Sequence, residues 1–348
     1  MKRAYNVCSH FDQGLVDSND LPLNVNREDL QKNKVMGLIS RKLTRKILDM
    51  LRDLARGGDG TGGGEDDEDT ETSEKKAETQ SKEQKSDEKY LKFWNEFGKA
   101  LKLGVLEDHR NKKRIIELLR FVSTRSPTTP ISLRSYVDHM KPGQKFIYFI
   151  AAGGVDEAEN SPFLERFRNK GYEVLYFTDN LDEFMNLQEY DDIPFQAITK
   201  ENVELDGKKM KEFLKQKEEE FAELKTWLKE AYGSKISKVQ ISSTLEATPM
   251  AIATATYGTS ARMEKIGKAQ AMGNQMYPMR ATKVLQINYR HPVIIEMKNR
   301  VHDSDATDEL KDLARLLLDM ALVKSGFEIE PDDKPNLAKE FPELFKKD

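Results

Sequence analysis

Residues 145–178 read KFIYFIAAGGVDEAENSPFLERFRNKGYEVLYFT, and this stretch decides the fold class. Two short runs at 145–151 and 172–178 are rich in aromatic and β-branched residues, which is typical of buried strands. Between them, residues 156–170 carry apolar side chains at helical spacing and end at Gly171. A further helical segment follows the second run. Two successive strand–helix units predict a parallel sheet covered by helices, joined by right-handed crossovers.

The chain before this stretch opens with a predicted helix that has one basic face. Apolar residues recur at helical spacing from Asn26 or Arg27 to Arg56. The opposite face carries the cations Arg41, Lys42, Arg45, Lys46 and Arg52. Two interpretations stay open, because such a face can be simply solvated or can bind an acidic partner.

Residues 57–88 differ sharply from the helix before them. They read GGDGTGGGEDDEDTETSEKKAETQSKEQKSDE and contain almost no apolar side chain. Such a segment cannot bury enough surface to offset its ordering entropy. The sequence therefore predicts a disordered insertion or linker over 57–89.

The rest of the chain alternates predicted helices and strands. Further helices are expected at 90–104, 111–121, 133–140, 181–188, 208–231, 262–272, 293–301 and 308–324. Further strands are expected at 236–245, 250–257 and 284–287. The predicted fold class is α/β and α+β, with a helix-covered βα domain followed by a smaller α+β domain. The expected segments are 1–56, 57–89, 90–232, 233–330 and a polar tail at 331–348.

Composition excludes several classes of function. The 348 residues include 56 Lys and Arg against 60 Asp and Glu, a net charge of -4. This balance offers no overall basic excess for nucleic acid or an anionic membrane. Cys8 is the sole cysteine and the five histidines are scattered, so we expect neither an internal disulfide nor a metal site. No apolar run approaches the roughly 20 residues of a membrane span.

Two motifs could bind other molecules, and each also has an ordinary structural explanation. The pair Gly153–Gly154 follows a strand, but neither GxGxxG nor GxxxxGK[ST] is present, which favours a simple turn. Arg27 and Gln31 share a helix face and could hold a phosphate group, or could form an ordinary helix cap and surface.

Methionines gather in the C-terminal third of the chain. They are Met250, Met263, Met272, Met276 and Met279. The segment 272–280, MGNQMYPMR, contains glycine, proline and polar residues that disfavour a helix. Its flexible apolar side chains indicate either an exposed contact surface or filling of a core.

Several long strings resemble one family. They are DSNDLPLNVNREDLQKNKVMGLISRKLTRKILDM, FWNEFGKALKLGVLEDHRNKKRIIELLRF, SLRSYVDHMKPGQKFIYFIA, SPFLERFRNKGYEVLYFTDNLDEF, TPMAIATATYGTSARMEKIGKAQA and INYRHPVI. In this order they resemble the middle and C-terminal domains of the 90-kilodalton heat-shock protein (Hsp90) chaperones, most of all the endoplasmic-reticulum branch. The resemblance implies a dimeric chaperone driven by ATP and Mg, which are bound by an N-terminal domain that is not in this chain. No cofactor is expected to bind this chain alone, so it is expected to be inactive as an enzyme by itself.

The resemblance also assigns roles to residues. Arg27 would contact the γ-phosphate in trans with Gln31 in support, while Leu21 and Leu23 would dock on the nucleotide domain. Client proteins would bind Met263, Met272, Met276 and Met279. A homodimer would form through Leu310, Leu313, Leu317 and Met320, although the tail matches no second helix of the family's dimer bundle. Location in the endoplasmic reticulum is implied, with the cytoplasm as alternative, because the chain ends FKKD and not KDEL.

Two other functions stay open at this point. The chain could be a non-catalytic interaction scaffold derived from such a chaperone, or a stand-alone α/β enzyme with a pocket near Gly153–Gly154. Stimulation of a supplied nucleotide domain would exclude the scaffold. Turnover by the chain alone would favour the enzyme.

Overall fold

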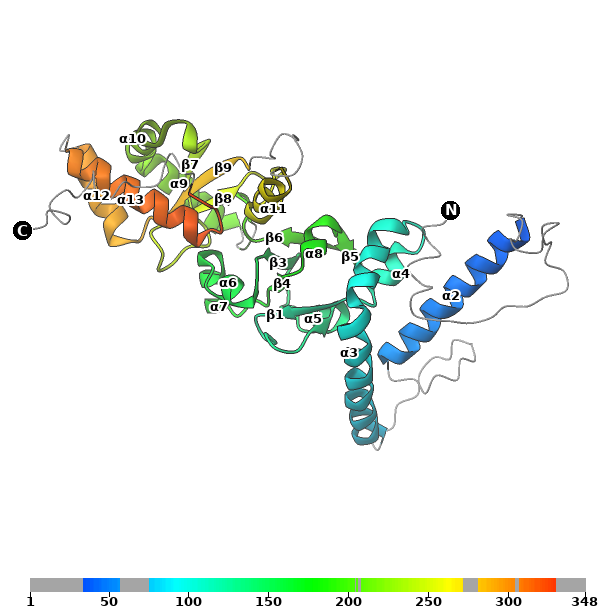
Figure 1. Cartoon of the computed structure of the whole chain (residues 1–348). Coiled ribbons are helices and arrows are strands. Elements are labelled where there is room, and N and C mark those ends of the chain that lie inside the picture. The colour runs from blue at the N-terminus through cyan, green and yellow to red at the C-terminus, as the bar shows by residue number, and fades with distance from the viewer. Residues whose placement is uncertain are drawn as a thin grey trace, which may run out of the picture. The chain divides into compact units, whose positions relative to one another are not determined.

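The computed structural model describes residues 34–56, 75–203, 205, 208–271, 281–303 and 307–329 (Figure 1). The chain divides into two compact units. Unit 1 is Met1–His139 with Asn180–Ile193, and unit 2 is Met140–Asp179 with Pro194–Asp348. The domain limits expected from the sequence stay predictions. The predicted fold class, α/β and α+β, is confirmed.

Unit 1 is mainly helical. Its described helices are α2 (Lys34–Arg56), α3 (Lys75–Glu107), α4 (Lys112–Ile116), α5 (Leu133–Asp138) and α8 (Asn180–Phe184). Its strands are β1 (Arg120–Ser123), β2 (Ile131–Ser132) and β5 (Glu189–Tyr190). β1 and β2 pair antiparallel, with Arg120 opposite Ser132.

The apolar stripes of α2 and α3 meet in the core of unit 1. Leu48 and Leu51 of α2 are buried, as are Tyr90 and Trp94 of α3. The Tyr90 hydroxyl donates a hydrogen bond to the Leu118 carbonyl at 2.5 Å. Burial raises the pKa of Tyr90 to about 12, so the phenol stays protonated and remains a donor.

A buried ion pair ties α3 to α8. Lys102 Nζ lies 2.7 Å from Asp182 Oδ1, with only 10% and 1% of the two side chains exposed. The ammonium group also lies 5.8 Å from the centre of the Trp94 ring and 5.7 Å from that of Phe121. Two opposite charges removed from water in this way depend on each other.

Unit 2 contains two small sheets. Its helices are α6 (Val155–Glu159), α7 (Glu165–Asn169), α9 (Lys208–Glu220), α10 (Ala222–Tyr232), α11 (Ala261–Ala271), α12 (Pro292–His302) and α13 (Asp308–Lys324), with 3-10 turns at Pro162–Leu164 and Gly233–Lys235. Its strands are β3 (Ile147–Ala151), β4 (Leu175–Phe177), β6 (Ile193–Ala197), β7 (Lys238–Ile241), β8 (Met250–Thr254) and β9 (Lys283–Ile287).

The first sheet of unit 2 is the predicted parallel one. β3 pairs in parallel with β4 on one side and with β6 on the other, with Phe149 opposite Leu175 and Ile147 opposite Phe195. The sequence analysis found β3 and β4 but missed β6. Pro194 and Gln196 interrupt the apolar run of β6, and this hid the strand.

The second sheet has the order β7–β9–β8, with β7 parallel and β8 antiparallel to β9. α10, α12 and α13 lie on one face of this sheet (Figure 1), and their apolar side chains form one core with alternate residues of its strands. Inside this core the Tyr232 hydroxyl donates to the Ala314 carbonyl at 2.7 Å. Burial raises the pKa of Tyr232 well above its usual value, so this donor is also permanent.

Several predicted helices are interrupted or shifted. The helix expected at 156–170 is split into α6 and α7, because Pro162 cannot continue a helix. The helix expected at 208–231 breaks at Phe221, which is buried in the core. The prediction for 111–121 was wrong in its second half, where β1 begins at Arg120. The predicted helix at 308–324 is confirmed as α13.

The predicted disordered insertion was too long. α3 begins at Lys75, well before the expected start of order at Tyr90. Residues 75–89 are mostly Lys, Glu, Gln and Ala, which are good helix formers, so a helix can continue through them without an apolar stripe. The start predicted for the first helix, Asn26 or Arg27, lies outside the described residues.

The Lys102–Asp182 pair gives a test of unit 1. Asp182→Asn leaves a buried ammonium without its carboxylate, and we expect the free energy of unfolding to fall by about 3–5 kcal/mol. Urea unfolding followed by Trp94 fluorescence, with Trp227 replaced by phenylalanine, measures this loss. Glu96→Gln, at an exposed position of α3, is the control. A loss no larger than that of the control would contradict the role assigned to the pair.

Candidate functional site

The positions predicted to meet a nucleotide domain lie outside the described residues. These are Leu21, Leu23, Arg27 and Gln31. Met272, Met276 and Met279 also lie outside them. The roles proposed for these residues stay predictions. Within the described residues, three features are candidates for a functional site. They are an exposed face of α13, the residues that flank the methionine segment 272–280, and a network of polar contacts in unit 2.

α13 has two apolar faces. One face packs into the core of unit 2 and consists of Leu310, Ala314, Leu317, Leu318, Ala321 and Leu322. The other face is exposed and consists of Leu313, Leu316, Met320 and Val323, whose exposed fractions are 39%, 55%, 47% and 58%. These four residues, called the outer row, recur at intervals of three and four and therefore lie along one side of the helix.

The outer row contains two of the four residues predicted for a dimer interface, and the interface itself stays a prediction. Leu313 and Met320 belong to it, whereas Leu310 and Leu317 are buried in the core of their own unit. Sequence reasoning missed Leu316 and Val323, because three consecutive leucines at 316–318 leave the rotation of the helix undetermined. A solvent-exposed row of four large apolar side chains is a feature of association surfaces.

Glu264 holds the residue that follows the methionine segment 272–280. It is a buried acid on α11, and its Oε2 accepts a hydrogen bond from the Ala281 N–H at 2.8 Å. Its Oε1 lies 3.2 Å from Lys268 Nζ and 3.8 Å from Lys283 Nζ. Glu264 therefore holds Ala281, the residue that follows the methionine segment 272–280, against the first turn of α11. Met263, at the start of α11, is half-buried.

A second acid, Glu165 on α7, holds the loop that precedes β8. Its Oε2 accepts hydrogen bonds from the N–H groups of Glu246 at 2.7 Å, Ala247 at 2.8 Å and Thr248 at 3.3 Å. Its Oε1 accepts from the Thr248 hydroxyl at 2.5 Å. Burial alone would raise the pKa of Glu165, but the bonds from Thr248, Glu246 and Ala247 outweigh it and lower the pKa overall.

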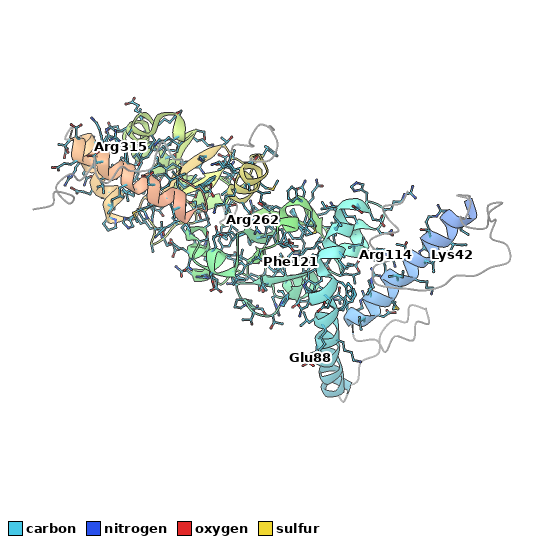
Figure 2. The ribbon with its side chains drawn as sticks, viewed as in Figure 1. Lys42, Glu88, Arg114, Phe121, Arg262 and Arg315 are labelled. Atoms are coloured by element: carbon cyan, nitrogen blue, oxygen red, sulfur yellow. The ribbon has the colours of Figure 1, made fainter. Side chains whose placement is uncertain are left out.

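Three more side chains connect the two sheets of unit 2. Arg166 donates to the Ser243 carbonyl at 2.6 Å, and Asn169 donates to the Glu246 carboxylate. Arg262, labelled in Figure 2, donates to the carbonyls of Phe177 at 2.9 Å and Thr178 at 2.6 Å. These side chains act together with backbone hydrogen bonds between Thr254 and residues Thr199 and Glu201, so the described contacts at the junction are polar.

Two cavities are described, one in each unit. The one beside Gly153 has a volume of about 80 Å³, and the Gly153 N–H donates to the carboxylate of Glu157 at 2.7 Å. A larger one in unit 1, of about 680 Å³, is lined by charges of both signs, among them the paired Arg52 and Glu117.

In the part of the chain that the structure describes, no group of three or more His, Cys, Asp or Glu could hold a metal ion. Within the same residues, no helix has the length and apolar content needed to cross a bilayer.

The fold and these surfaces define a class of protein. A helix-covered parallel sheet, joined by polar contacts to a small mixed sheet with an exposed apolar helix face, is suited to docking other chains. Comparison with protein families identifies the class: residues 9–348 match the family "Hsp90 protein". The chain belongs to the Hsp90 family of chaperones.

Individual relatives agree with this assignment. The chain is 43% identical over 330 residues to an endoplasmin homolog of Hordeum vulgare, covering 93% of this chain and 39% of that protein. It is 42% identical over 325 residues to an endoplasmin homolog of Arabidopsis thaliana, covering 91% and 38%. It is 42% identical over 327 residues to an endoplasmin homolog of Catharanthus roseus, again covering 91% and 38%. The chain thus spans about two fifths of the length of these relatives.

The Glu165 contacts predict a pH-dependent stability. A carboxyl group whose pKa is lower in the folded than in the unfolded chain stabilises the fold above its unfolded pKa, roughly 4.3. This contribution is lost as the pH falls through the folded pKa. Glu165→Gln should cost about 1–2 kcal/mol at pH 7, at the low end for charge-assisted bonds because the carboxylate is only half-buried.

Urea unfolding followed by Trp227 fluorescence, with Trp94 replaced by phenylalanine, measures the cost of Glu165→Gln. The difference from the parent chain should shrink below about pH 4, where both carry a neutral side chain at this position. Asp156→Asn, at an exposed position of α6, is the control. A difference that stays constant from pH 7 to pH 3 would show that the charge of Glu165 is unimportant.

Proposed function

We propose that this chain is the middle and C-terminal part of a molecular chaperone, which binds client proteins, pairs with a second copy of itself and activates an ATP-binding domain. The observation that carries the proposal is the family match over residues 9–348. The exposed outer row of α13 supports it from the structure, because it offers a surface for assembly.

The activating role is assigned to Arg27 with Gln31 in support. Bound ATP with Mg supplies the phosphoryl group whose transfer drives the chaperone cycle. A guanidinium group that approaches in trans neutralises charge developing on that group, and docking through Leu21 and Leu23 excludes water around it. The metal and the nucleotide are assigned to the N-terminal ATP-binding domain, so the role of this chain is to complete that site.

Client binding is assigned to the methionine segment. Methionine side chains are flexible and polarizable, so Met263, Met272, Met276 and Met279 suit apolar partners of varied shape. The Glu264 bond to Ala281 supports this assignment, because it fixes the residue that follows the segment to a folded framework. Binding residues on a surface segment held by a rigid scaffold are common in proteins.

The names of the relatives support a location. All three are endoplasmin homologs, so we assign the chain to the endoplasmic reticulum, with the cytoplasm as the alternative. The same resemblance implies assembly as a homodimer. The outer row of α13 is the surface proposed for it.

The dimer can be tested by mass. The unmodified chain should be a dimer by light scattering, and should dissociate only at the dilute end of a concentration series. Leu316→Glu combined with Val323→Glu places two charges in the outer row, and we expect at least a tenfold weaker dimer. Arg315→Glu, on the exposed polar side of α13 (Figure 2), is the control. A double variant that dimerises as tightly as the parent would exclude the outer row as the interface.

The activating arginine can be tested by turnover. In this chain joined to a family ATP-binding domain, Arg27→Ala should lower ATP hydrolysis at least tenfold, which corresponds to about 1.4 kcal/mol of transition-state stabilisation. Its thermal unfolding should not change. Arg300→Ala, at a surface position of α12, should leave turnover as it is. Equal turnover by the parent and the Arg27→Ala chain would refute the role of this residue.

A further inference from the structure

The small cavity beside Gly153 is lined by more cations than anions. Its volume is about 80 Å³, and its charged lining residues are Arg262, Lys265, Lys324 and one acid, Glu157. They lie on α11, α13 and α6, so three helices of unit 2 bring these charges together. An excess of positive charge around a small space attracts anions.

The carboxylate of Glu157 shows how an oxyanion is held beside this cavity. Its Oε2 accepts a hydrogen bond from the Gly153 N–H at 2.7 Å, and its Oε1 lies 3.7 Å from Lys265 Nζ. The Glu157 side chain is 45% exposed, and an ion pair with so much contact to solvent is weak. An anion from solution can therefore compete with this carboxylate for the same partners.

Two glycines make room for the carboxylate. A Cβ atom at position 153 would lie 2.6 Å from Glu157 Oε2, and a Cβ atom at position 326 would lie 3.2 Å from Glu157 Oε1. Gly326 follows α13 with a φ of 82°, a conformation that glycine adopts at low cost. Two backbone segments thus form a cradle that side chains at these positions would narrow.

The size and charge of the cavity select a small oxyanion. Pockets for organic ligands usually enclose about 300–1,000 Å³, whereas this cavity encloses about 80 Å³. Arg262 is held by its bonds to the carbonyls of Phe177 and Thr178, which fix the position of its charge. Lys265 and Lys324 have long side chains with compact charges, which suit phosphate as a ligand.

We propose that this cavity binds inorganic phosphate, which replaces the Glu157 carboxylate on the Gly153 N–H and is held by Lys265 and Lys324. Glu157 turns to solvent when the ion binds and returns when it leaves. Gly153 follows β3 of the parallel sheet, whereas α13 packs on the second sheet. The bound ion therefore adds a link between the two sheets of unit 2.

Nuclear magnetic resonance of the full chain tests the site at one atom. Ala152–Gly153 is the only Ala–Gly step in the sequence. Labelling alanine with ¹³C at the carbonyl and glycine with ¹⁵N therefore gives a single carbonyl-coupled signal, which belongs to the Gly153 N–H. Inorganic phosphate at pH 7.5, with ionic strength held constant by sodium chloride, should shift this signal in a saturable way.

Variants of the two lysines show whether the phosphate lies in the cavity. Lys265→Gln combined with Lys324→Gln should weaken phosphate binding at least fivefold, because the ion loses two charges. Lys215→Gln combined with Lys311→Gln removes two exposed lysines that do not line the cavity, and should leave binding as it is.

A variant of the acid shows whether the carboxylate competes. Glu157→Gln should tighten phosphate binding at least threefold, because the neutral amide does not repel the ion. Asp156→Asn, at an exposed neighbouring position that does not line the cavity, is the control and should change binding less than twofold. O-phosphoserine should bind the parent chain at least fivefold more weakly than phosphate, because the cavity has no room for its organic part.

Four results would overturn the proposal. An equal shift in sodium chloride alone would show a general effect of salt. Equal affinities of the two double lysine variants would place the phosphate elsewhere. Binding that Glu157→Gln leaves unchanged would show that the carboxylate does not hold the place of the ion. O-phosphoserine binding as tight as that of phosphate would assign the site to the phosphoryl group of a larger ligand.

Discussion

The carboxylate of Glu165 is the contact on which the arrangement of unit 2 depends. It gathers three backbone N–H groups and one hydroxyl from the loop at 246–248, and these donors would otherwise need water. The loop leads into β8, an edge strand of the second sheet, in which β9 is the central strand. A single acid at the start of a short helix beside the first sheet therefore holds the segment that enters β8.

The polar contacts between the two sheets of unit 2 determine how easily the connection between these sheets can be broken and re-formed. The contacts described between the two sheets are polar: long side chains bond across the junction, and the backbone groups of Thr199 and Glu201 pair with Thr254 at the end of β8. Hydrogen bonds of this kind contribute modest net free energy, so they can exchange for bonds to water at small cost. An apolar junction would resist such exchange, because its loss exposes surface to solvent. The two sheets of unit 2 are thus joined by hydrogen bonds that water can replace.

Much of the framework could be predicted from the sequence, and particular residues show where the prediction stopped. The runs KFIYFIA and YEVLYFT gave β3 and β4, and the leucine spacing gave the bounds of α13. β6 was not predicted, because Pro194 and Gln196 interrupt its run of apolar residues. The contacts of Glu165 and Glu264 were not predicted, because an acid on a charged helix is normally expected to face solvent. Their partners come from distant parts of the chain and are brought close only by the fold. The sequence therefore indicates elements well, whereas contacts between distant segments depend on tertiary packing.

The hydrogen bond from Tyr232 to the Ala314 carbonyl also affects which residues of α13 can be replaced, including those of the outer row. It joins a buried phenol to the backbone of α13 and not to a side chain, so it fixes the rotation of the helix whatever residues stand on its outward side. The side chains that pack inward and those that face solvent are therefore selected independently. The outward residues of α13 can therefore be replaced without repacking the core, which gives a protein engineer a free choice of side chains on that side of the helix.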